Sequence, residues 1–372
     1  MSTRQRFIDY VKNGSDEPFI SLQLGGGAGF DAKLAGKLWH SDGTLDDTIR
    51  AYEIVGCEPL FNIGLPGLDK LSPEIKKHVN REDTETEKTW EEFTETPYGD
   101  IEWKFHERHK TGVVILKYAL NVDDGEKVFD IVSWYAEQHL NAADSIPEVL
   151  GPTIEKLHKH GAVSVQWNMQ PFELFGLASV DNLVLLAKIY PERFRKTCDF
   201  IIEVSKEIAK YTIVDAGSDF VFLGGPGSEM LSPQFYKDYL IPDSQKITDS
   251  VHQNGGLIYS HICSPIEPFL SMGCYNEMGI DLFETLSPPP VGNVPDLAEA
   301  RKVMNPDICT RGNIGLDVLL NGSVEDVEKG TIEILEATKG TKHMVAASDY
   351  LFYDIPLENA KVMVDTVRNW SR

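Results

Sequence analysis

The sequence lacks the features that mark membrane proteins, secreted proteins and nucleic-acid-binding proteins. No apolar run approaches the roughly 20 residues that a membrane-spanning helix needs. The first residues contain no apolar core of a signal peptide, so we expect a cytoplasmic protein. The formal charge of −23 is the opposite of the basic footprint that nucleic acids require. We therefore expect neither a membrane nor a nucleic acid as a partner.

Cysteine is also scarce, and its spacing excludes a disulfide framework. The chain has five cysteines, an odd number at irregular intervals, and no Cys-x-x-Cys motif. Cys57, Cys198 and Cys274 lie in apolar or helical surroundings and are expected to fill the core. Cys309 lies early in a predicted strand and is expected inside the fold. Only Cys263 follows a histidine on a strand, which makes it the cysteine of chemical interest.

A regular alternation of strand and helix patterns runs along the 372 residues. Hydrophobic residues make up 42% and charged residues 25%, which is typical of a globular protein. The predicted strands begin near residues 19, 59, 162, 218, 257, 281, 307 and 343. Eight strands that are nearly all followed by helix predict an α/β fold, a (β/α)₈ TIM barrel, with a doubly wound sheet as the alternative. No linker divides the chain, so we expect a single domain over residues 1–372.

One segment interrupts this rhythm. Ile101–His106 and Gly112–Ala119 have strand patterns and flank a charged turn. The pattern predicts a β-hairpin insertion at about residues 97–121, in the N-terminal part of the barrel.

His261 and Cys263 end the predicted strand that begins at Leu257. Residues two apart on a strand point to the same face, so an imidazole and a thiol should lie side by side. Zinc prefers both ligands, and a further one must come from another strand end. Asp349, after the last strand, is the first candidate, and Glu229, in the loop after residue 224, is the second. Zinc with two or three protein ligands keeps a position open for substrate, which is a catalytic arrangement.

The other polar and aromatic residues at strand ends are candidates for the substrate site, because barrel enzymes react at that face. Trp167 and Asn168 follow the strand at 162, and together with Glu229 they are predicted to bind substrate. The glycine-rich segment Gly25–Phe30 follows the first strand. It lacks the spacing of a dinucleotide-binding loop, so a tight loop lining a pocket is favoured over a phosphate site.

Several segments together resemble the uroporphyrinogen decarboxylase superfamily over roughly residues 95–370. In chain order the main segments are Met230-Leu-Ser-Pro-Gln-Phe-Tyr, Leu240-Ile-Pro242, His261-Ile-Cys263, Arg311-Gly-Asn-Ile314 and Ile355-Pro-Leu-Glu-Asn359. A further segment, Pro171-Phe-Glu-Leu, is similar to a Pro-Phe-Thr-Leu-like segment of that family. The resemblance implies a (β/α)₈ barrel, in agreement with the strand count.

The superfamily contains decarboxylases and cobalamin-dependent methyltransferases, and the chain is more similar to the second branch. The decarboxylases hold a tetrapyrrole with an arginine-rich N-terminal loop, whereas Gly25–Phe30 contains no arginine. The methyltransferases, such as methylcobalamin:coenzyme M methyltransferases and relatives that serve O-demethylation, bind zinc through His-x-Cys and a later cysteine. Here His261 and Cys263 match, and Asp349 stands near the place of the later cysteine. Either Asp349 replaces that thiolate, or the metal site is altered or absent.

The resemblance implies a zinc-dependent enzyme that moves a methyl group between a small substrate and a corrinoid. The substrate would be a methyl ether, amine or thiol, and His261, Cys263 and Asp349 would be the catalytic and metal-binding residues. No Asp-x-His-x-x-Gly pattern occurs in the chain, so methylcobalamin or another corrinoid is expected on a partner protein. The alternatives are a metal-free lyase related to uroporphyrinogen decarboxylase, with His261 as a general acid, and a non-catalytic barrel that binds a corrinoid or tetrapyrrole.

Overall fold

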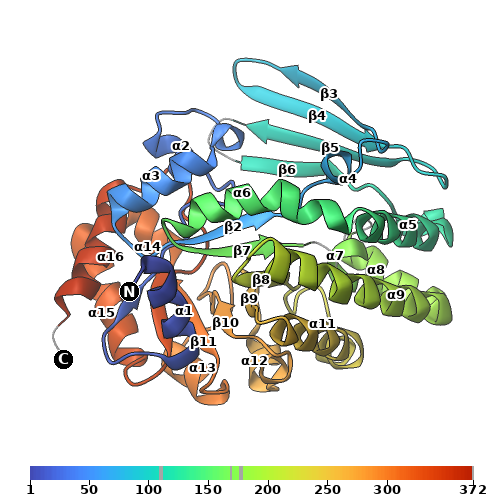
Figure 1. The fold of residues 1–372 in the computed structure, drawn as a ribbon. Coiled ribbons are helices and arrows are strands. Elements are labelled where there is room, and N and C mark those ends of the chain that lie inside the picture. The colour runs from blue at the N-terminus through green and yellow to red at the C-terminus, as the bar shows by residue number, and fades with distance from the viewer. Residues whose placement is uncertain (109–111, 168–169, 176–178, 371–372) are drawn as a thin grey trace.

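Eight parallel strands form the predicted barrel in a computed structural model that describes residues 1–108, 112–167, 170–175 and 179–370 (Figure 1). Their order around the sheet is β1, β12, β11, β10, β9, β8, β7, β2, which follows the chain. The strands are β1 (Phe19–Ile20), β2 (Leu60–Gly64), β7 (Ala162–Gln166), β8 (Phe220–Gly224), β9 (Leu257–His261), β10 (Leu282–Glu284), β11 (Cys309–Ile314) and β12 (His343–Ala347). The prediction of a (β/α)₈ barrel is confirmed, and the doubly wound alternative is wrong because the strand order does not reverse.

Hydrogen bonds beside β1 and β2 close the ring where the strand ladder stops. The Glu58 backbone N–H donates to the Ile20 carbonyl at 3.1 Å. The Ser21 hydroxyl donates to the Glu58 carbonyl at 2.8 Å. These contacts join β1 to β2 and complete the ring. Because all eight strands are parallel, their carboxyl ends lie on one rim.

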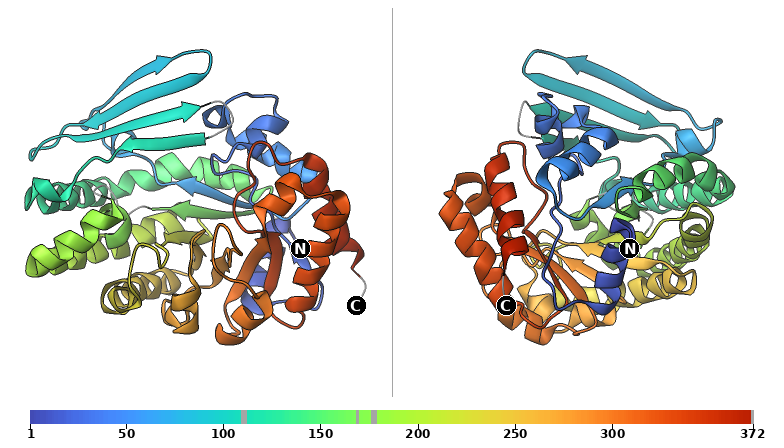
Figure 2. Two further views of the ribbon diagram at one scale, coloured as in Figure 1. Left: turned by 180° about the vertical axis from the view of Figure 1, so that it is seen from behind. Right: turned by 60° about the vertical axis from the view of Figure 1, so that its left-hand side comes forward.

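Helices cover the outside of the barrel (Figures 1 and 2). They are α2 (Phe30–Leu34), α3 (Leu45–Val55), α4 (Leu68–Leu71), α5 (Lys127–Asn141), α6 (Ile146–His158), α7 (Pro171–Phe175), α8 (Val180–Ile189), α9 (Pro191–Lys210), α10 (Pro233–Phe235), α11 (Ile241–Gln253), α12 (Glu267–Ser271), α13 (Leu297–Val303), α14 (Leu316–Asn321), α15 (Val324–Ala337) and α16 (Leu357–Asn369). Successive strand residues alternate between two apolar clusters. Val221 and Leu223 face the helix layer, whereas Phe220 and Phe222 face the barrel interior. The interior positions are the ones that reach the rim.

Helix α1 (Thr3–Asn13) closes the other end of the barrel. Phe7 packs against Phe19 and Phe220, with ring centroids 5.8 and 6.0 Å apart. The Tyr10 hydroxyl donates to the His343 carbonyl at 2.7 Å. The base of the barrel is thus sealed by apolar contacts, and its mouth is at the carboxyl ends of the strands.

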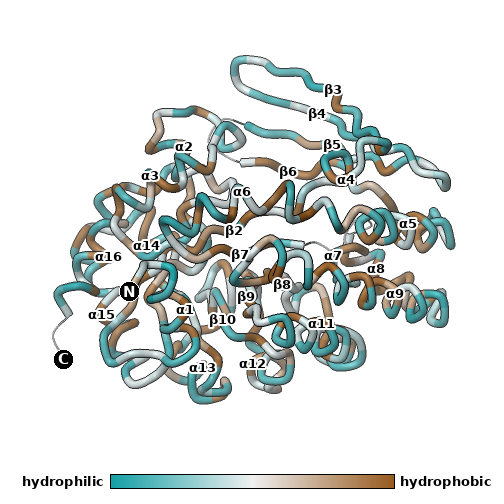
Figure 3. The backbone as a smooth tube through the Cα atoms, in the orientation of Figure 1, coloured by the Kyte–Doolittle hydropathy of each residue, from teal (hydrophilic) through white to brown (hydrophobic). Residues whose placement is uncertain are grey.

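The insertion is larger than the predicted hairpin. The hairpin strands β5 (Ile101–Arg108) and β6 (Gly112–Lys117) are present, and they continue a four-stranded antiparallel sheet with β3 (Lys77–Asp83) and β4 (Glu87–Thr94). The side chains of β3 are all exposed, and β3 and β4 appear mostly hydrophilic in Figure 3. Cross-strand ion pairs such as Lys77–Glu92 at 2.5 Å join them. Because neither strand has an apolar face, the sequence showed no period-two pattern there.

The insertion is fixed to the barrel by a buried carboxylate. Glu107 is fully buried and accepts hydrogen bonds from the Ser41 backbone N–H at 3.0 Å and from its hydroxyl at 2.6 Å. Lys88 donates to Asp42 at 2.8 Å. These contacts hold the sheet over the loop between α2 and α3.

Candidate metal centre

Strand β9 brings His261 and Cys263 to the mouth of the barrel. His261 is the last residue of β9, and the chain continues alongside β10, because the Ile262 N–H donates to the Glu284 carbonyl at 2.9 Å. Ile262 is buried in the helix-facing core. His261 and Cys263 therefore share the opposite, interior side, as their spacing predicted.

Asp349 reaches the same point from the loop after β12. The Ser348 N–H donates to the Ile314 carbonyl at 2.8 Å and extends the strand pairing to the rim. The Tyr350 N–H then donates to Asp349 Oδ1 at 2.7 Å and fixes the carboxylate. Strand β12 is separated from β9 by two strands, β11 and β10, so the ends of the two strands lie near each other on the rim.

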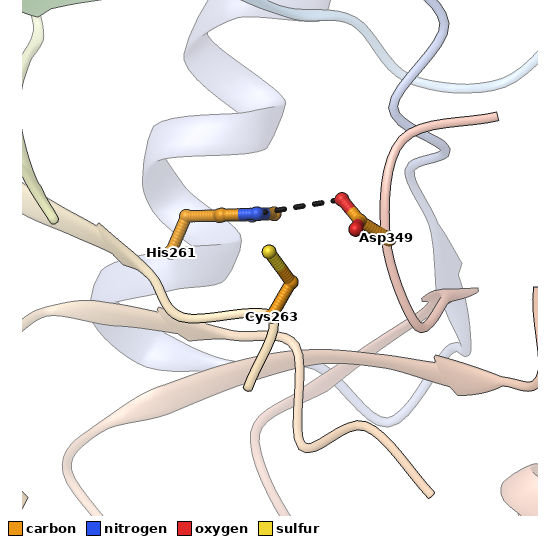
Figure 4. A group of neighbouring side chains, drawn as sticks. All are labelled: His261, Cys263 and Asp349. Atoms are coloured by element: carbon orange, nitrogen blue, oxygen red, sulfur yellow. Dashed lines mark ion pairs between the residues drawn. The ribbon is translucent and has the colours of Figure 1, made fainter. Parts of the chain in front are cut away.

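The three predicted ligands meet (Figure 4). One donor atom from each of His261, Cys263 and Asp349 lies within 4.8 Å of the others. The distance from His261 Nε2 to Asp349 Oδ1 is 3.4 Å. Among the described residues this is the one group of three such side chains close enough to share an ion. Glu229, the second candidate for the third ligand, is outside the group and exposed in the loop after β8.

Glu284 holds the His261 ring from behind. Its Oε1 lies 2.7 Å from His261 Nδ1. A carboxylate on one imidazole nitrogen fixes the ring and leaves the other nitrogen, here Nε2, for a metal ion. Glu284 stands opposite His261 in the β9–β10 register, which explains how a residue 23 positions away becomes its partner.

A buried charge network supports Glu284 in turn. Arg311, its register partner on β11, donates to Glu284 Oε2, and Gln23 donates to the same oxygen at 2.8 Å. The Tyr259 hydroxyl donates to the other oxygen. Burial alone would raise the pKa of Glu284, but Arg311 and His261 lower it to about 2. Glu284 is therefore ionised throughout the physiological range.

His261 is surrounded by acceptors. Burial alone would lower the pKa of its imidazole, but hydrogen bonds with Asp349, Cys263 and Glu284 raise it well above the ordinary value. The same environment that favours an imidazolium also favours any other cation at this point. The centre is thus built to hold positive charge.

The glycine-rich loop packs beside this centre. Tyr350 lies next to His261, with ring centroids 5.3 Å apart. Gly26 has a φ of +75°, and a Cβ there would lie 2.5 Å from the Tyr350 ring. Gly29 pairs with Phe352 as an isolated bridge. The Gly25–Phe30 loop therefore braces the segment that carries Asp349.

The predicted substrate residues do not join the group formed by His261, Cys263 and Asp349. Trp167 is 2% exposed and belongs to the helix-facing core, although its indole N–H has no partner among the described residues. Asn168 lies outside the described residues. Sequence reasoning also missed the supporting roles of Glu284 and Arg311. The available signals were that Glu284 falls at the end of a predicted strand and that Arg311 opens the Arg311-Gly-Asn-Ile314 segment.

Comparison with known proteins identifies relatives of this barrel. A family model described as uroporphyrinogen decarboxylase (URO-D) matches residues 171–370. A uroporphyrinogen decarboxylase of Gloeobacter violaceus is 24% identical over 213 residues, which cover 56% of this chain and 58% of the relative. One from Novosphingobium aromaticivorans is 26% identical over 257 residues, covering 63% and 70%. The matched region thus spans little more than half of the Gloeobacter protein.

A solved structure extends the likeness in fold to the whole chain. A methyltransferase from Methanosarcina mazei superposes with a TM-score of 0.63 at 18% identity, covering 99% of this chain and 98% of the other. This similarity confirms the fold. Among the described residues, no helix has the length and apolar character needed to cross a bilayer.

Proposed function

Since the chain belongs to the uroporphyrinogen decarboxylase family, we propose that it is a zinc-dependent methyltransferase of that family. It would move a methyl group between a small methyl ether, amine or thiol and the corrinoid of a partner protein. The observation that carries the proposal is the meeting of His261, Cys263 and Asp349 at the barrel mouth.

The donor set fits zinc. It combines a thiolate, an imidazole and a carboxylate, all of which zinc accepts. The Glu284 contact leaves His261 Nε2 directed at Asp349, within the same small volume. Three protein ligands leave a fourth position for a substrate atom. When bound, zinc would act as a Lewis acid on the substrate oxygen, nitrogen or sulfur.

The residues of the chain would orient that atom and exclude water. Glu284 and Arg311 fix His261, so that the ligands need no rearrangement when substrate binds. Tyr350 and the Gly25–Phe30 loop cover one side of the centre. In thiol methylation the sulfur pair would form the S–C bond, the cobalt–carbon pair would stay on cobalt, and the thiol proton would pass to solvent.

The test is a methyl-transfer assay with free cobalamin in place of the partner. Methylcobalamin is supplied with simple thiols, and cob(I)alamin with methyl ethers and methylamines, while the cobalamin absorbance is followed. We expect turnover with at least one class, loss of turnover after removal of the metal, and recovery when zinc is added. Glu284→Ala should weaken zinc affinity by about 10- to 100-fold. Turnover that survives metal removal would contradict the proposal.

A metal-free lyase is the second candidate, favoured by the similarity to uroporphyrinogen decarboxylases. His261, with its raised pKa, would donate a proton to the substrate and Asp349 would balance its charge. Decarboxylation of uroporphyrinogen by metal-free protein would favour this alternative. The absence of arginine from Gly25–Phe30 weighs against it, because a polycarboxylate needs cationic partners.

A further inference from the structure

Glu173 brings an additional carboxylate to the mouth of the barrel, one strand from His261. It lies on the single-turn helix α7, which follows β7. Its Oε1 accepts a hydrogen bond from the Gly224 N–H at 3.3 Å, and Gln170 donates to its Oε2 at 2.9 Å. Gly224 is paired in register with His261.

Gly224 makes room for this carboxylate. Phe222 and Tyr259, each two residues earlier on its strand, both point into the barrel interior, so Gly224 and His261 occupy the next interior layer. A Cβ on Gly224 would lie 3.1 Å from Glu173 Oε1. The carboxylate thus takes the place of a side chain beside the metal centre.

The other charged groups at the mouth pair with one another, and Glu173 has no cationic partner among the described residues. Glu284 is neutralised by Arg311, and Asp349 lies against His261. Among the described residues no cation contributes to the electrostatics of Glu173. Its donors are the Gln170 side chain and the backbone N–H groups of Gly224 and Gln170, and all of them are neutral. Burial raises its pKa to about 7. A carboxyl group in this position lacks the cation that would stabilise its charge.

We propose that Glu173 selects substrates that carry a positively charged alkylammonium group at the end away from the transferred methyl group. The inference rests on the proposed function, because that function places the reacting atom at His261, Cys263 and Asp349. The ammonium group would donate to Glu173 and supply the missing cation. The chain's net charge of −23 would draw such substrates in and repel anionic ones.

Three thiols of similar size test the charge preference: 2-aminoethanethiol, 2-mercaptoethanol and 3-mercaptopropionate. Each serves as methyl acceptor from methylcobalamin with the zinc-loaded protein at pH 8. We expect kcat/KM to be highest for the ammonium thiol and lowest for the carboxylate thiol. The ammonium-to-hydroxyl ratio should be about 10 to 100, the range for a hydrogen bond to a charged group.

Glu173→Gln keeps the size of the side chain and removes its charge. It should bring the three kcat/KM values to within about threefold of each other, with the largest loss for the ammonium thiol. Glu192→Gln, which changes an exposed glutamate on α9, should keep the wild-type preference. An equal loss of rate with all three thiols in Glu173→Gln, or an unchanged preference, would overturn the proposal.

A binding measurement without metal separates this proposal from the proposed function. Metal-stripped protein is titrated with n-propylammonium and with propionate in a calorimeter. We expect n-propylammonium to bind the wild type more tightly than it binds Glu173→Gln, and propionate to bind neither. If this preference is present while no methyl transfer occurs, the proposed function fails and the cation site stands. Equal affinity of both proteins for n-propylammonium would refute the cation site.

Discussion

The mouth and the base of the barrel each hold a carboxylate, a histidine and an arginine. Among the described residues, only the mouth also gathers three side-chain atoms that could bind a metal ion. At the base, Asp219 accepts three hydrogen bonds from Arg4, the shortest at 2.7 Å, and one from the Val163 N–H at 3.0 Å. It also lies 3.2 Å from His158. At the mouth, Glu284 holds His261 by one nitrogen. The other nitrogen faces Asp349 and Cys263.

The two clusters differ in whether their groups are all paired with one another. All the partners of Asp219 are protein groups that close the barrel end beneath α1. Burial opposes ionisation of Asp219, but His158 and Arg4 hold its pKa below the ordinary value. At the mouth, a similar set of residue types fixes one histidine and leaves three ligand atoms together. Similar residue types thus pair with one another at the base of the barrel, whereas at the mouth they hold one histidine beside two further candidate ligands.

Arg311→Leu should give the largest loss of stability. It leaves Glu284 ionised and buried without its arginine, which costs about 3–5 kcal/mol in the free energy of unfolding. Urea denaturation at pH 7 measures the loss. The double variant Arg311→Leu with Glu284→Gln should recover part of it, because no uncompensated charge remains. A single variant within about 1 kcal/mol of the wild type would show that the network is not essential for folding.

Asp219→Asn should cost less, about 2 kcal/mol, because Arg4 is partly exposed and keeps water as a partner. The lowered pKa of Asp219 means that its contribution is present at neutral pH and is lost as the pH falls through the folded-state value. Thermal unfolding at pH 7 and pH 3 should therefore show a gap between the variant and the wild type that narrows in acid. A gap that widens in acid would contradict the assignment of Asp219 as an ionised group.

The strands of the barrel and the meeting of the three candidate ligands could be predicted from the sequence, since both depend on local patterns. Alternating β and α segments indicated the barrel, and the i, i+2 spacing of His261 and Cys263 indicated one strand face. Asp349 followed from its place after the last strand. These inferences needed no knowledge of how one strand registers with the next.

The remaining features depend on register and on packing between distant segments. Glu284 supports His261 because β9 and β10 pair at that point, and no local pattern encodes the pairing. Glu173, on the helix after β7, has room at the mouth because Gly224, on the neighbouring strand β8, has no side chain. The strands β3 and β4 were missed because they have no apolar alternation of their own, and β4 is held by its pairing with β5.

Glu173→Gln should have a smaller effect, which is absent at pH 4 and grows as the pH rises. The folded-state pKa of about 7 lies above the ordinary 4.5, so between these values the folded chain keeps a proton that the unfolded chain has released. Wild-type stability therefore falls as the pH rises through this window. The full shift corresponds to about 3 kcal/mol, but Glu173 is only partly buried. The variant lacks the loss and should therefore exceed the wild type by about 1–2 kcal/mol at pH 8, with no difference at pH 4. Thermal unfolding across this range measures it, and equal stability at pH 8 would refute the raised pKa.

Lys77→Ala in the insertion should have the smallest effect. The Lys77–Glu92 pair is partly exposed at the surface, and such pairs contribute about 0–1 kcal/mol. Raising the salt concentration should remove what contribution there is. Urea denaturation at low and high salt makes the comparison, and a loss above about 2 kcal/mol would show that β3 anchors the sheet more strongly than its exposure indicates.

The most direct test of the metal centre is the zinc content of the purified protein, measured by mass spectrometry. We predict one zinc per chain in the wild type and its loss in His261→Ala, Cys263→Ala and Asp349→Ala. His158→Ala, which removes the histidine at the base, should keep the zinc and serves as the matched control. Protein that binds no zinc at any concentration, or that retains zinc in the three mouth variants, would contradict the account.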